Sequence, residues 1–264
     1  MNDFSQLLHE ANERPFFGWD FSYDGRISSK FPWDYESIVV SHARRSPDML
    51  DMGTGGGEWL SRLPFRPGRT IATEGWEPHV PIARKRLQSL GIEVIQVEGA
   101  PDNTEQDANC AHGRLPFPDA SFNLVTNRHE AFVASEVARI LISGGRFLTQ
   151  QVASGSNCDF CRLLGVPTPP VHVPSWTLDL ASTQIQGAGL LMEASGVGVE
   201  ICTFADVGAL AWYLKNLPWV FPNFSIESFR AQLHRLHLSV ERGEPLSAHQ
   251  RLFWLAARKP SLAS

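Results

Sequence analysis

The sequence predicts an α/β fold in which a mostly parallel sheet carries helices on both faces. Short apolar runs recur along the chain, and patterns with helical spacing lie between them. The chain contains no internal repeat or low-complexity tract that would indicate a solenoid or a disordered segment. Strands that alternate with helices in this way form doubly wound parallel sheets.

The first predicted strand is DMLDMG, which ends at Gly53, and the second is RTIATEGW, whose apolar part covers residues 69–72. The segment EPHVPIARKRLQSLG has apolar residues near helical spacing and a stop at Gly91, so it predicts a helix. IEVIQVEGA alternates as a third strand, and SFNLVTNRHE predicts a fourth strand through Thr126.

The next predicted elements are a helix in EVARILISGG, closed by its two glycines, and a fifth strand in RFLTQQVA. The proline-rich segment SGSNCDFCRLLGVPTPPVHVPSW predicts a loop. A capped helix in TLDLASTQIQGAGL and a sixth strand in GVEICTF follow. Two further helices, one ending before Pro218 and one from about Ile226 to Gly243, precede a last strand in QRLFWLAARKP.

Composition narrows the function. The chain has 264 residues, 43% hydrophobic and 19% charged, and a formal net charge of -5. This balance is typical of globular proteins and shows no basic surplus that would attract a phosphate backbone. The start, MNDFSQLLHEANERPFF, lacks the features of a signal peptide, and no run of 18 uncharged apolar residues occurs. We therefore expect a cytoplasmic protein with no membrane partner, and nucleic acid is an unlikely partner; nothing in the sequence indicates its oligomeric state.

The four cysteines do not predict a metal site. They are Cys110, Cys158, Cys161 and Cys202. The pair in CDFC has the spacing of half a zinc site, but a structural zinc ion needs four ligands and no second pair matches. We therefore expect no bound metal.

The most informative segment is LDMGTGGGEWL, where an acid and four glycines follow a predicted strand. Gly53, Gly55 and Gly57 allow positive φ and a close approach of backbone to a ligand. A dinucleotide fingerprint would require glycine where Glu58 stands, and Asp51 would repel a pyrophosphate. A cationic or phosphate-free ligand fits better. The alternative is a tight turn that needs glycine for packing alone.

This segment resembles motif I, D-x-G-x-G-x-G, of class I S-adenosylmethionine (AdoMet)-dependent methyltransferases. The resemblance continues in ATEGWEP, LPFPDASFNLVTNRHE and SGGRFLTQQV, and so runs from about Met49 to Val152. It implies a Rossmann-like sheet whose last strand is an antiparallel edge, and AdoMet as the cofactor. The positive sulfonium and neutral sugar of AdoMet suit Asp51 beside a glycine loop.

The resemblance also implies roles for individual residues. Asp51 orients the loop or the methionine amine, and Glu74 holds the ribose diol, with Glu77 as its rival. Trp76 lies against the adenine or packs on the protein. Asp102 and Asn103 follow the third strand and read the adenine amino group. They begin a loop, PDNTEQDANCAHGR, that is longer than usual, so a later acid is the alternative to Asp102. The full set of predicted cofactor-binding residues is Asp51, Gly53, Thr54, Gly55, Gly57, Glu74, Gly75, Trp76, Asp102, Asn103 and Asn127.

His129, in NRHEAF at the end of the fourth strand, is the predicted catalytic residue. Methyl transfer is an in-line displacement that depends mainly on positioning, but a protonated nucleophile also needs a base. Histidine can serve as this base, because its ordinary pKa of about 6.5 lies near the working pH. The alternatives are that His129 caps the next helix, and that Arg128 pairs with Glu130 to fix the loop. Of Gln150 and Gln151, only one is expected to face the cleft.

The flanking segments are expected to select the substrate. Residues 1–36 are predicted to form an aromatic-rich lid on a methyltransferase domain of residues 37–264, which carries a helical insertion at about 205–246. Most of the lid aromatics could instead pack on the core. The predicted substrate-binding residues are Trp19, Tyr23, Trp33, Arg128, His129 and Gln151.

The sequence thus predicts an AdoMet-dependent methyltransferase that acts on an O, N or C nucleophile of a small, planar or aromatic metabolite. One alternative is an RNA methyltransferase, which a basic stripe on the cleft rim would support. Another is a catalytically silent AdoMet-binding partner subunit. A nicotinamide oxidoreductase is disfavoured by Asp51 and Glu58.

Overall fold

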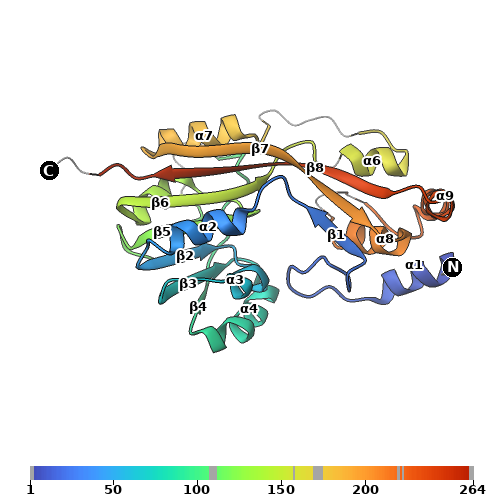
Figure 1. Cartoon of the computed structure of the whole chain (residues 1–264), viewed down its shortest axis with the longest axis horizontal. Coiled ribbons are helices and arrows are strands. Elements are labelled where there is room, and N and C mark those ends of the chain that lie inside the picture. Colours follow the sequence, from blue (N-terminus) through green and yellow to red (C-terminus); the bar gives the residue numbers. More distant parts are fainter. Residues whose placement is uncertain are drawn as a thin grey trace. The chain divides into compact units, whose positions relative to one another are not determined.

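A computed structural model describes residues 3–106, 112–156, 158–168, 175–218, 221 and 223–261 (Figure 1). The helices are α1 Phe4–Glu13, α2 Tyr35–Ala43, α3 Glu58–Arg62, α4 Val80–Leu87, α5 Ala134–Ile140, α6 Cys158–Leu164, α7 Leu178–Gly187, α8 Val207–Lys215 and α9 Arg230–Glu241, with the 3-10 turns η1 Glu77–His79 and η2 Gln88–Leu90. The strands are β1 Ile27–Lys30, β2 Asp48–Met52, β3 Arg69–Glu74, β4 Glu93–Gln96, β5 Phe122–Arg128, β6 Leu141–Val152, β7 Leu191–Phe204 and β8 Leu246–Arg258.

The strands form one sheet in the order β1-β7-β8-β6-β5-β2-β3-β4. Strands β4, β3, β2, β5 and β6 pair in parallel, β8 is antiparallel to β6, and β1 is antiparallel to β7. The predicted α/β fold with a mostly parallel sheet and an antiparallel last strand is therefore confirmed. The expectation that the last strand forms an edge is wrong, because β8 lies between β6 and β7.

The chain divides into two compact units. Unit 1 consists of residues 1–32, 154–171 and 199–251, and unit 2 of residues 33–153, 172–198 and 252–264. Unit 1 therefore combines most of the predicted lid segment with all of the predicted helical insertion. The lid roles of both segments stay predictions.

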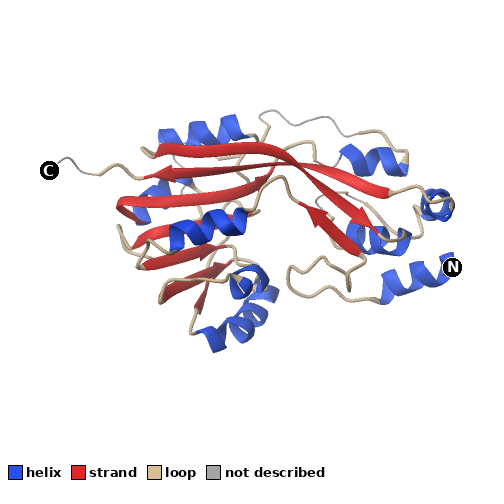
Figure 2. Cartoon of the chain, viewed as in Figure 1, coloured by secondary structure: helices blue, strands red, loops and turns tan. Residues whose placement is uncertain are grey.

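In unit 2, helices flank the central strands (Figure 2), and adjacent residues of each of these strands enter different cores. Met49, Leu124 and Leu148 pack with residues of α2, α3 and α4, whereas their neighbours Leu50 and Val125 pack with residues of α5 and α7. All five side chains are fully buried. Both faces of the central strands are thus apolar, which explains why these strands read as short continuous apolar runs.

Three predicted elements differ from the structure. The helix expected in EVARILISGG ends at Ile140, because the next residue, Leu141, pairs with Phe122 in the sheet. Its two glycines lie instead where the β5–β6 register shifts. The segment expected to be a loop contains α6, and β7 begins at Leu191, seven residues before the predicted start at Gly198.

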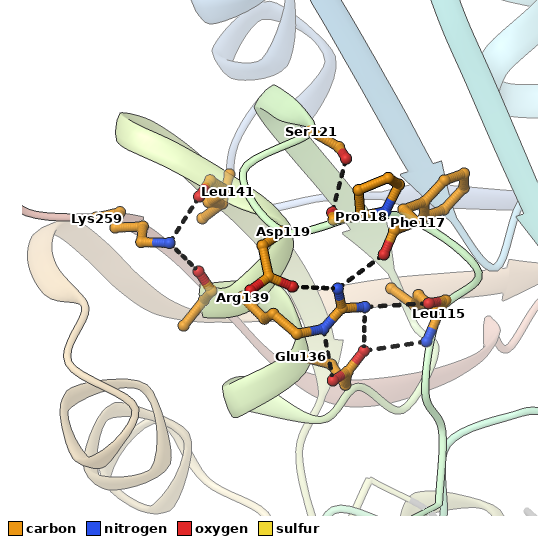
Figure 3. Close-up of polar contacts among 10 residues, drawn as sticks. Leu115, Phe117, Pro118, Asp119, Ser121, Glu136, Arg139, Leu141 and Lys259 are labelled. Carbon is orange, nitrogen blue, oxygen red and sulfur yellow. Dashed lines mark hydrogen bonds and ion pairs between the residues drawn. The ribbon is translucent and has the colours of Figure 1, made fainter.

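Arg139, near the end of α5, holds the segment that leads into β5 (Figure 3). Its guanidinium donates to the carboxylates of Glu136 and Asp119 and to the backbone carbonyls of Leu115 and Phe117. The Glu136 carboxylate in turn accepts the backbone N–H of Leu115. One side chain thereby fixes the path of residues 115–119 and the start of the strand that carries His129.

Unit 1 has its own apolar core, built from α1, α6, α8, α9 and the adjoining parts of β7 and β8. Asp206 caps α8 by accepting the backbone N–H of Ala209 and also pairs with Arg26. Lys215 donates to the carbonyls of Ala11 and Asn12 at the end of α1. Helix α1 was not predicted, although Phe4, Leu7, Leu8 and Ala11 have helical spacing and the last three are buried. Strand β1, which has four residues, was not predicted either.

None of the described helices combines the length and apolar character needed to cross a bilayer. Within the described ranges, no three His, Cys, Asp or Glu side chains are grouped to hold a metal ion. Burial raises the pKa of the Cys161 and Cys202 thiols. Cys110 lies outside the described residues.

Candidate functional site

The predicted cofactor loop follows β2 in unit 2. Asp51 is only 2% exposed, and its carboxylate accepts a hydrogen bond of 2.9 Å from the hydroxyl of Thr126 on the neighbouring strand β5. Burial raises the pKa of Asp51 to about 6, with the carboxylate of Glu74 acting in the same direction. Strand β2 thus places the buried carboxyl group of Asp51 directly before the glycine loop.

The loop itself requires glycine at two positions. Gly53 and Gly57 have φ values of 68° and 79°, which side chains rarely adopt. A Cβ on Gly53 would lie 2.4 Å from Cγ of Glu130, and one on Gly57 would lie 2.9 Å from Cγ of Leu87. The backbone of this loop therefore lies in direct contact with both neighbouring side chains.

Glu74, the predicted ribose ligand, ends β3 and is buried. Its two carboxylate oxygens accept the backbone N–H groups of Gly55 at 2.6 Å and Trp76 at 2.7 Å. Because each carboxylate oxygen has two acceptor positions, both can still accept a hydroxyl. The hydrogen bonds hold the carboxylate beside the loop, with its second acceptor positions available for a diol.

Glu130 completes an acidic trio with Asp51 and Glu74. Burial raises its pKa to about 7, and the charge of Glu74 adds to this effect. The sequence indicates for Glu130 only an alternative ion pair with Arg128, because nothing local in NRHEAF indicates contact with Gly53. Tyr35 is a second residue that the sequence did not identify: it is buried, and its hydroxyl donates to the carbonyl of Asn127 at 3.1 Å.

Asn127, predicted to bind cofactor, is fully buried in β5. Its Oδ1 accepts from the hydroxyl of Thr149 at 2.8 Å and from the amide of Gln151 at 2.6 Å. The same Gln151 amide donates to the carbonyl of Glu130, and the Gln151 carbonyl accepts from the indole of Trp176. Nδ2 of Asn127 has no hydrogen-bond partner among the described residues, so it is a buried donor whose hydrogen-bonding capacity is unsatisfied.

His129, the predicted base, follows the last residue of β5 and has a φ of 59°. Its Nε2 lies 2.9 Å from Nε2 of Gln150, and Oε1 of Gln150 accepts from the indole of Trp33 at 2.7 Å. Burial, and then the positive charge of Arg128, lower the pKa of His129 well below its ordinary value. The two glutamines at the end of β6 are both buried, and each contacts a different predicted site residue.

The predicted adenine residues make mostly local contacts. The carboxylate of Asp102 accepts the backbone N–H and hydroxyl of Thr104, and the amide of Asn103 donates to the carbonyl of Phe132. Gly75 packs against the backbone of Gly99, where a Cβ would lie 3.2 Å away. Trp76 is 63% exposed beside Glu74, which leaves one of its surfaces free for stacking.

The structure also shows how Glu58 is accommodated where a dinucleotide fingerprint has glycine. Glu58 begins α3, is buried, and forms an ion pair with Arg86. Arg86 also donates to the carbonyl of Gly56. The third glycine is thus replaced by an acid that binds its own partner from α4.

Two of the predicted substrate aromatics, Trp19 and Tyr23, belong to unit 1. Tyr23 is buried and stacks on Trp212 at a ring distance of 4.8 Å, with the guanidinium groups of Arg14 and Arg26 over its ring. A cavity of about 180 Å³ borders this cluster and is lined mainly by aromatic and charged residues: Arg14, Pro15, Phe16, Phe17, Asp20, Ser22, Tyr23, Asp24 and Trp212.

Comparison with known proteins agrees with this geometry. Residues 50–149 match the family described as a methyltransferase domain. The chain is 31% identical over 120 residues to YcgJ of Bacillus subtilis, which is named an uncharacterized methyltransferase. The aligned part spans 42% of this chain and 43% of that relative.

Solved structures share the fold. A proposed methyltransferase of Bacillus halodurans superposes with a TM-score of 0.56 at 19% identity, over 86% of this chain and 99% of that one. YcgJ gives 0.54 at 18% identity, over 86% and 98%. The cyclase SpnF gives 0.51 at 15% identity, over 98% and 93%. Residues 50–149 thus match a methyltransferase domain, and the chain shares the fold of these solved structures.

Proposed function

We propose that this protein uses AdoMet to methylate an O, N or C nucleophile of a small, planar or aromatic metabolite. The observation that carries the proposal is the acidic trio of Asp51, Glu74 and Glu130 around the glycine loop. Burial raises the pKa of each of these carboxyls. A cationic ligand is therefore favoured over a pyrophosphate at this loop.

The residues present fit AdoMet in their chemistry. Glu74 keeps acceptor positions for the ribose hydroxyls, and the loop from Gly53 to Gly57 offers backbone to the amino-acid portion. Asp51 and Glu130 supply negative charge for the ammonium and sulfonium groups. When bound, AdoMet supplies the electrophilic methyl group.

The protein's own contribution to catalysis is positioning. Asn127 offers a buried donor, and His129 lies in the segment directly after it, so both belong to the end of β5. Arg128 and Gln151 are the other predicted substrate contacts at this end of the sheet. Held donors of this kind can align a nucleophile for in-line displacement, which is where most of the rate enhancement of such a reaction arises.

The substrate class rests on charge and aromatic content. A net charge of -5 argues against a polyanionic substrate, and eight aromatic residues occur between residues 16 and 35. Trp19, Tyr23 and Trp33 are among them and remain the proposed substrate contacts. A small-molecule partner and a cytoplasmic location are part of the same proposal.

The test uses AdoMet labelled on the methyl carbon. After binding of AdoMet is confirmed by calorimetry, the full chain is incubated with a low-molecular-weight cell extract and, separately, with total RNA. Label in the small-molecule pool supports the proposal, and mass spectrometry then identifies the acceptor. Label in RNA would overturn the substrate class. Binding without transfer to either pool would favour a catalytically silent partner subunit.

A further inference from the structure

We propose that Trp33 and Gln150 hold His129 as the neutral Nδ1–H tautomer, so that His129 serves the site as a hydrogen-bond donor and not as the base. Trp33 and Gln150 are then positioning residues that act through His129. The tautomer stands on contacts within unit 2, whereas its use in methyl transfer rests on the proposed function.

The first step is the orientation of the Gln150 amide. An indole nitrogen can only donate a hydrogen bond, so the atom of Gln150 that lies 2.7 Å from Nε1 of Trp33 must be the carbonyl oxygen. The opposite orientation would bring an N–H of the amide against the indole N–H. Gln150 is 1% exposed, so water cannot readily replace the lost contact.

The second step is the tautomer of His129. With Oε1 directed at Trp33, the amide nitrogen of Gln150 lies 2.9 Å from Nε2 of His129 and can only donate to it. Nε2 must therefore carry the lone pair, and the proton of the neutral ring is on Nδ1. A doubly protonated ring would place N–H against N–H, and turning the amide would move the same conflict to Trp33.

The backbone supports a held side chain at this position. Non-glycine residues with positive φ are uncommon, and such strain persists where the surrounding structure enforces it. His129 has a φ of 59°, and its backbone N–H donates to the carbonyl of Gln150 at 2.8 Å. Gln150 therefore holds both the backbone and the ring of His129.

The remaining ring nitrogen is available. Among the described residues, Nδ1 of His129 has no hydrogen-bond partner, whereas the lone pair on Nε2 is already used. Burial and Arg128 both disfavour the charged ring, in agreement with the contacts. The group that His129 can offer a substrate is thus an N–H donor, which suits an acceptor such as a carbonyl, carboxylate or phenolate oxygen.

The test measures the tautomer directly. The full chain with ¹⁵N-labelled histidine is studied by imidazole ¹H–¹⁵N correlation spectra from pH 5.5 to 8.5, and the His129 signals are assigned by their loss in His129→Asn. We expect the Nδ1–H pattern throughout this range. An Nε2–H pattern, or a titration near pH 6.5, would overturn the proposal whether or not the protein transfers methyl groups.

Three variants sharpen the result. Gln150→Glu offers Nε2 an acceptor, so it should reverse the tautomer and raise the pKa of His129 by about 1 or more. Trp33→Phe should mix the tautomers. Trp176→Phe is the matched control, because its indole donates to Gln151 and leaves Gln150 untouched. Unchanged His129 spectra in both Gln150→Glu and Trp33→Phe would contradict the proposal.

If the proposed methyl transfer is confirmed, activity provides a second readout. The amide nitrogen of asparagine can occupy a position close to Nδ1 of histidine, and asparagine tolerates positive φ better than most residues. We expect His129→Asn to keep at least about tenfold more activity than His129→Ala. Equal losses of about 10²–10⁴-fold in both variants, with AdoMet affinity intact, would indicate a base instead.

Discussion

Glu130 packs on Gly53 so closely that a Cβ on the glycine would lie 2.4 Å from Cγ of the glutamate. The two residues come from loops that follow neighbouring strands of the sheet, β2 and β5. Their contact joins the glycine loop to the segment that carries His129. A substitution at either residue should therefore change ligand binding at the proposed cofactor site as well as the local packing.

We expect Gly53→Ala to lose AdoMet binding, because the new Cβ must displace Glu130. Gly91→Ala is a matched control: Gly91 has the same φ of 68°, but nothing lies within 4 Å of its Cβ position. Both variants should lose about 1–2 kcal/mol of unfolding free energy from the backbone conformation alone. Calorimetry and urea unfolding separate the two effects. Equal AdoMet affinity in the two variants would contradict the contact.

Asp51→Asn should weaken AdoMet binding by about 10–150-fold, the value of one hydrogen bond to a charged group. The fold should survive, because asparagine can still accept the hydrogen bond from Thr126. Asp48→Asn is the control, since Asp48 is a buried acid at the opposite end of the same strand, where it accepts from Asn123. Affinity that is unchanged in Asp51→Asn would remove Asp51 from the site.

The preference for AdoMet over S-adenosylhomocysteine should rise between pH 5.5 and 8. Asp51 and Glu130, with pKa values of about 6 and about 7, are largely protonated at the lower pH and ionised at the higher one. Only the first ligand carries a sulfonium charge that gains from this ionisation. Calorimetric titrations at several pH values measure the ratio, and Glu130→Gln should flatten its upper part. A ratio independent of pH would place both acids away from the sulfur.

The same pKa values predict how the ligand-free protein responds to pH. Because burial raises both pKa values, the folded chain holds these protons more tightly than the unfolded chain. Their contribution to stability is fully present below the unfolded pKa of about 4 and is lost as the pH rises through about 6 and 7. The melting temperature should therefore fall over this window, and the fall should be smaller in Glu130→Gln. No difference between the two proteins would contradict the assignment.

Arg139→Lys should destabilise unit 2 by about 1–3 kcal/mol, because lysine cannot reach two carboxylates and two carbonyls at once. Arg114→Lys, an exposed arginine in the same segment, is the control and should change stability by less than about 0.5 kcal/mol. Urea unfolding of both variants measures the difference. AdoMet affinity at the opposite end of the strands should change little in either.

The local pattern of apolar residues was enough to predict the parallel strands. It was not enough where a strand and its position depend on pairing with distant parts of the chain. The strands β2, β3 and β5 are buried on both faces, so their apolar runs were visible in the sequence. In contrast, the first half of β7 contains Glu193, Ser195 and Gly196 on a largely exposed strand, and no apolar run reveals it. The position of β8 between β6 and β7 depends on pairing partners that are far away in the chain.

The residues of the candidate site also divide into those that a local motif predicts and those that only long-range contacts place. Asp51, Glu74 and the glycines belong to one contiguous motif or directly follow a strand, so their order along the chain was enough to find them. Glu130 and Gln150 owe their place to contacts with Gly53 and His129, which no spacing encodes. The state of His129 depends on an indole almost a hundred residues earlier, in Trp33.

The acidic trio would also affect the release of the demethylated cofactor after methyl transfer. Transfer of the methyl group turns a sulfonium into a neutral thioether, so the attraction of Asp51, Glu74 and Glu130 falls at the moment the reaction is complete. Carboxylates that attract the proposed AdoMet cofactor would therefore hold its demethylated product less tightly. Product inhibition should accordingly be weakest in alkaline solution, where the trio is fully charged.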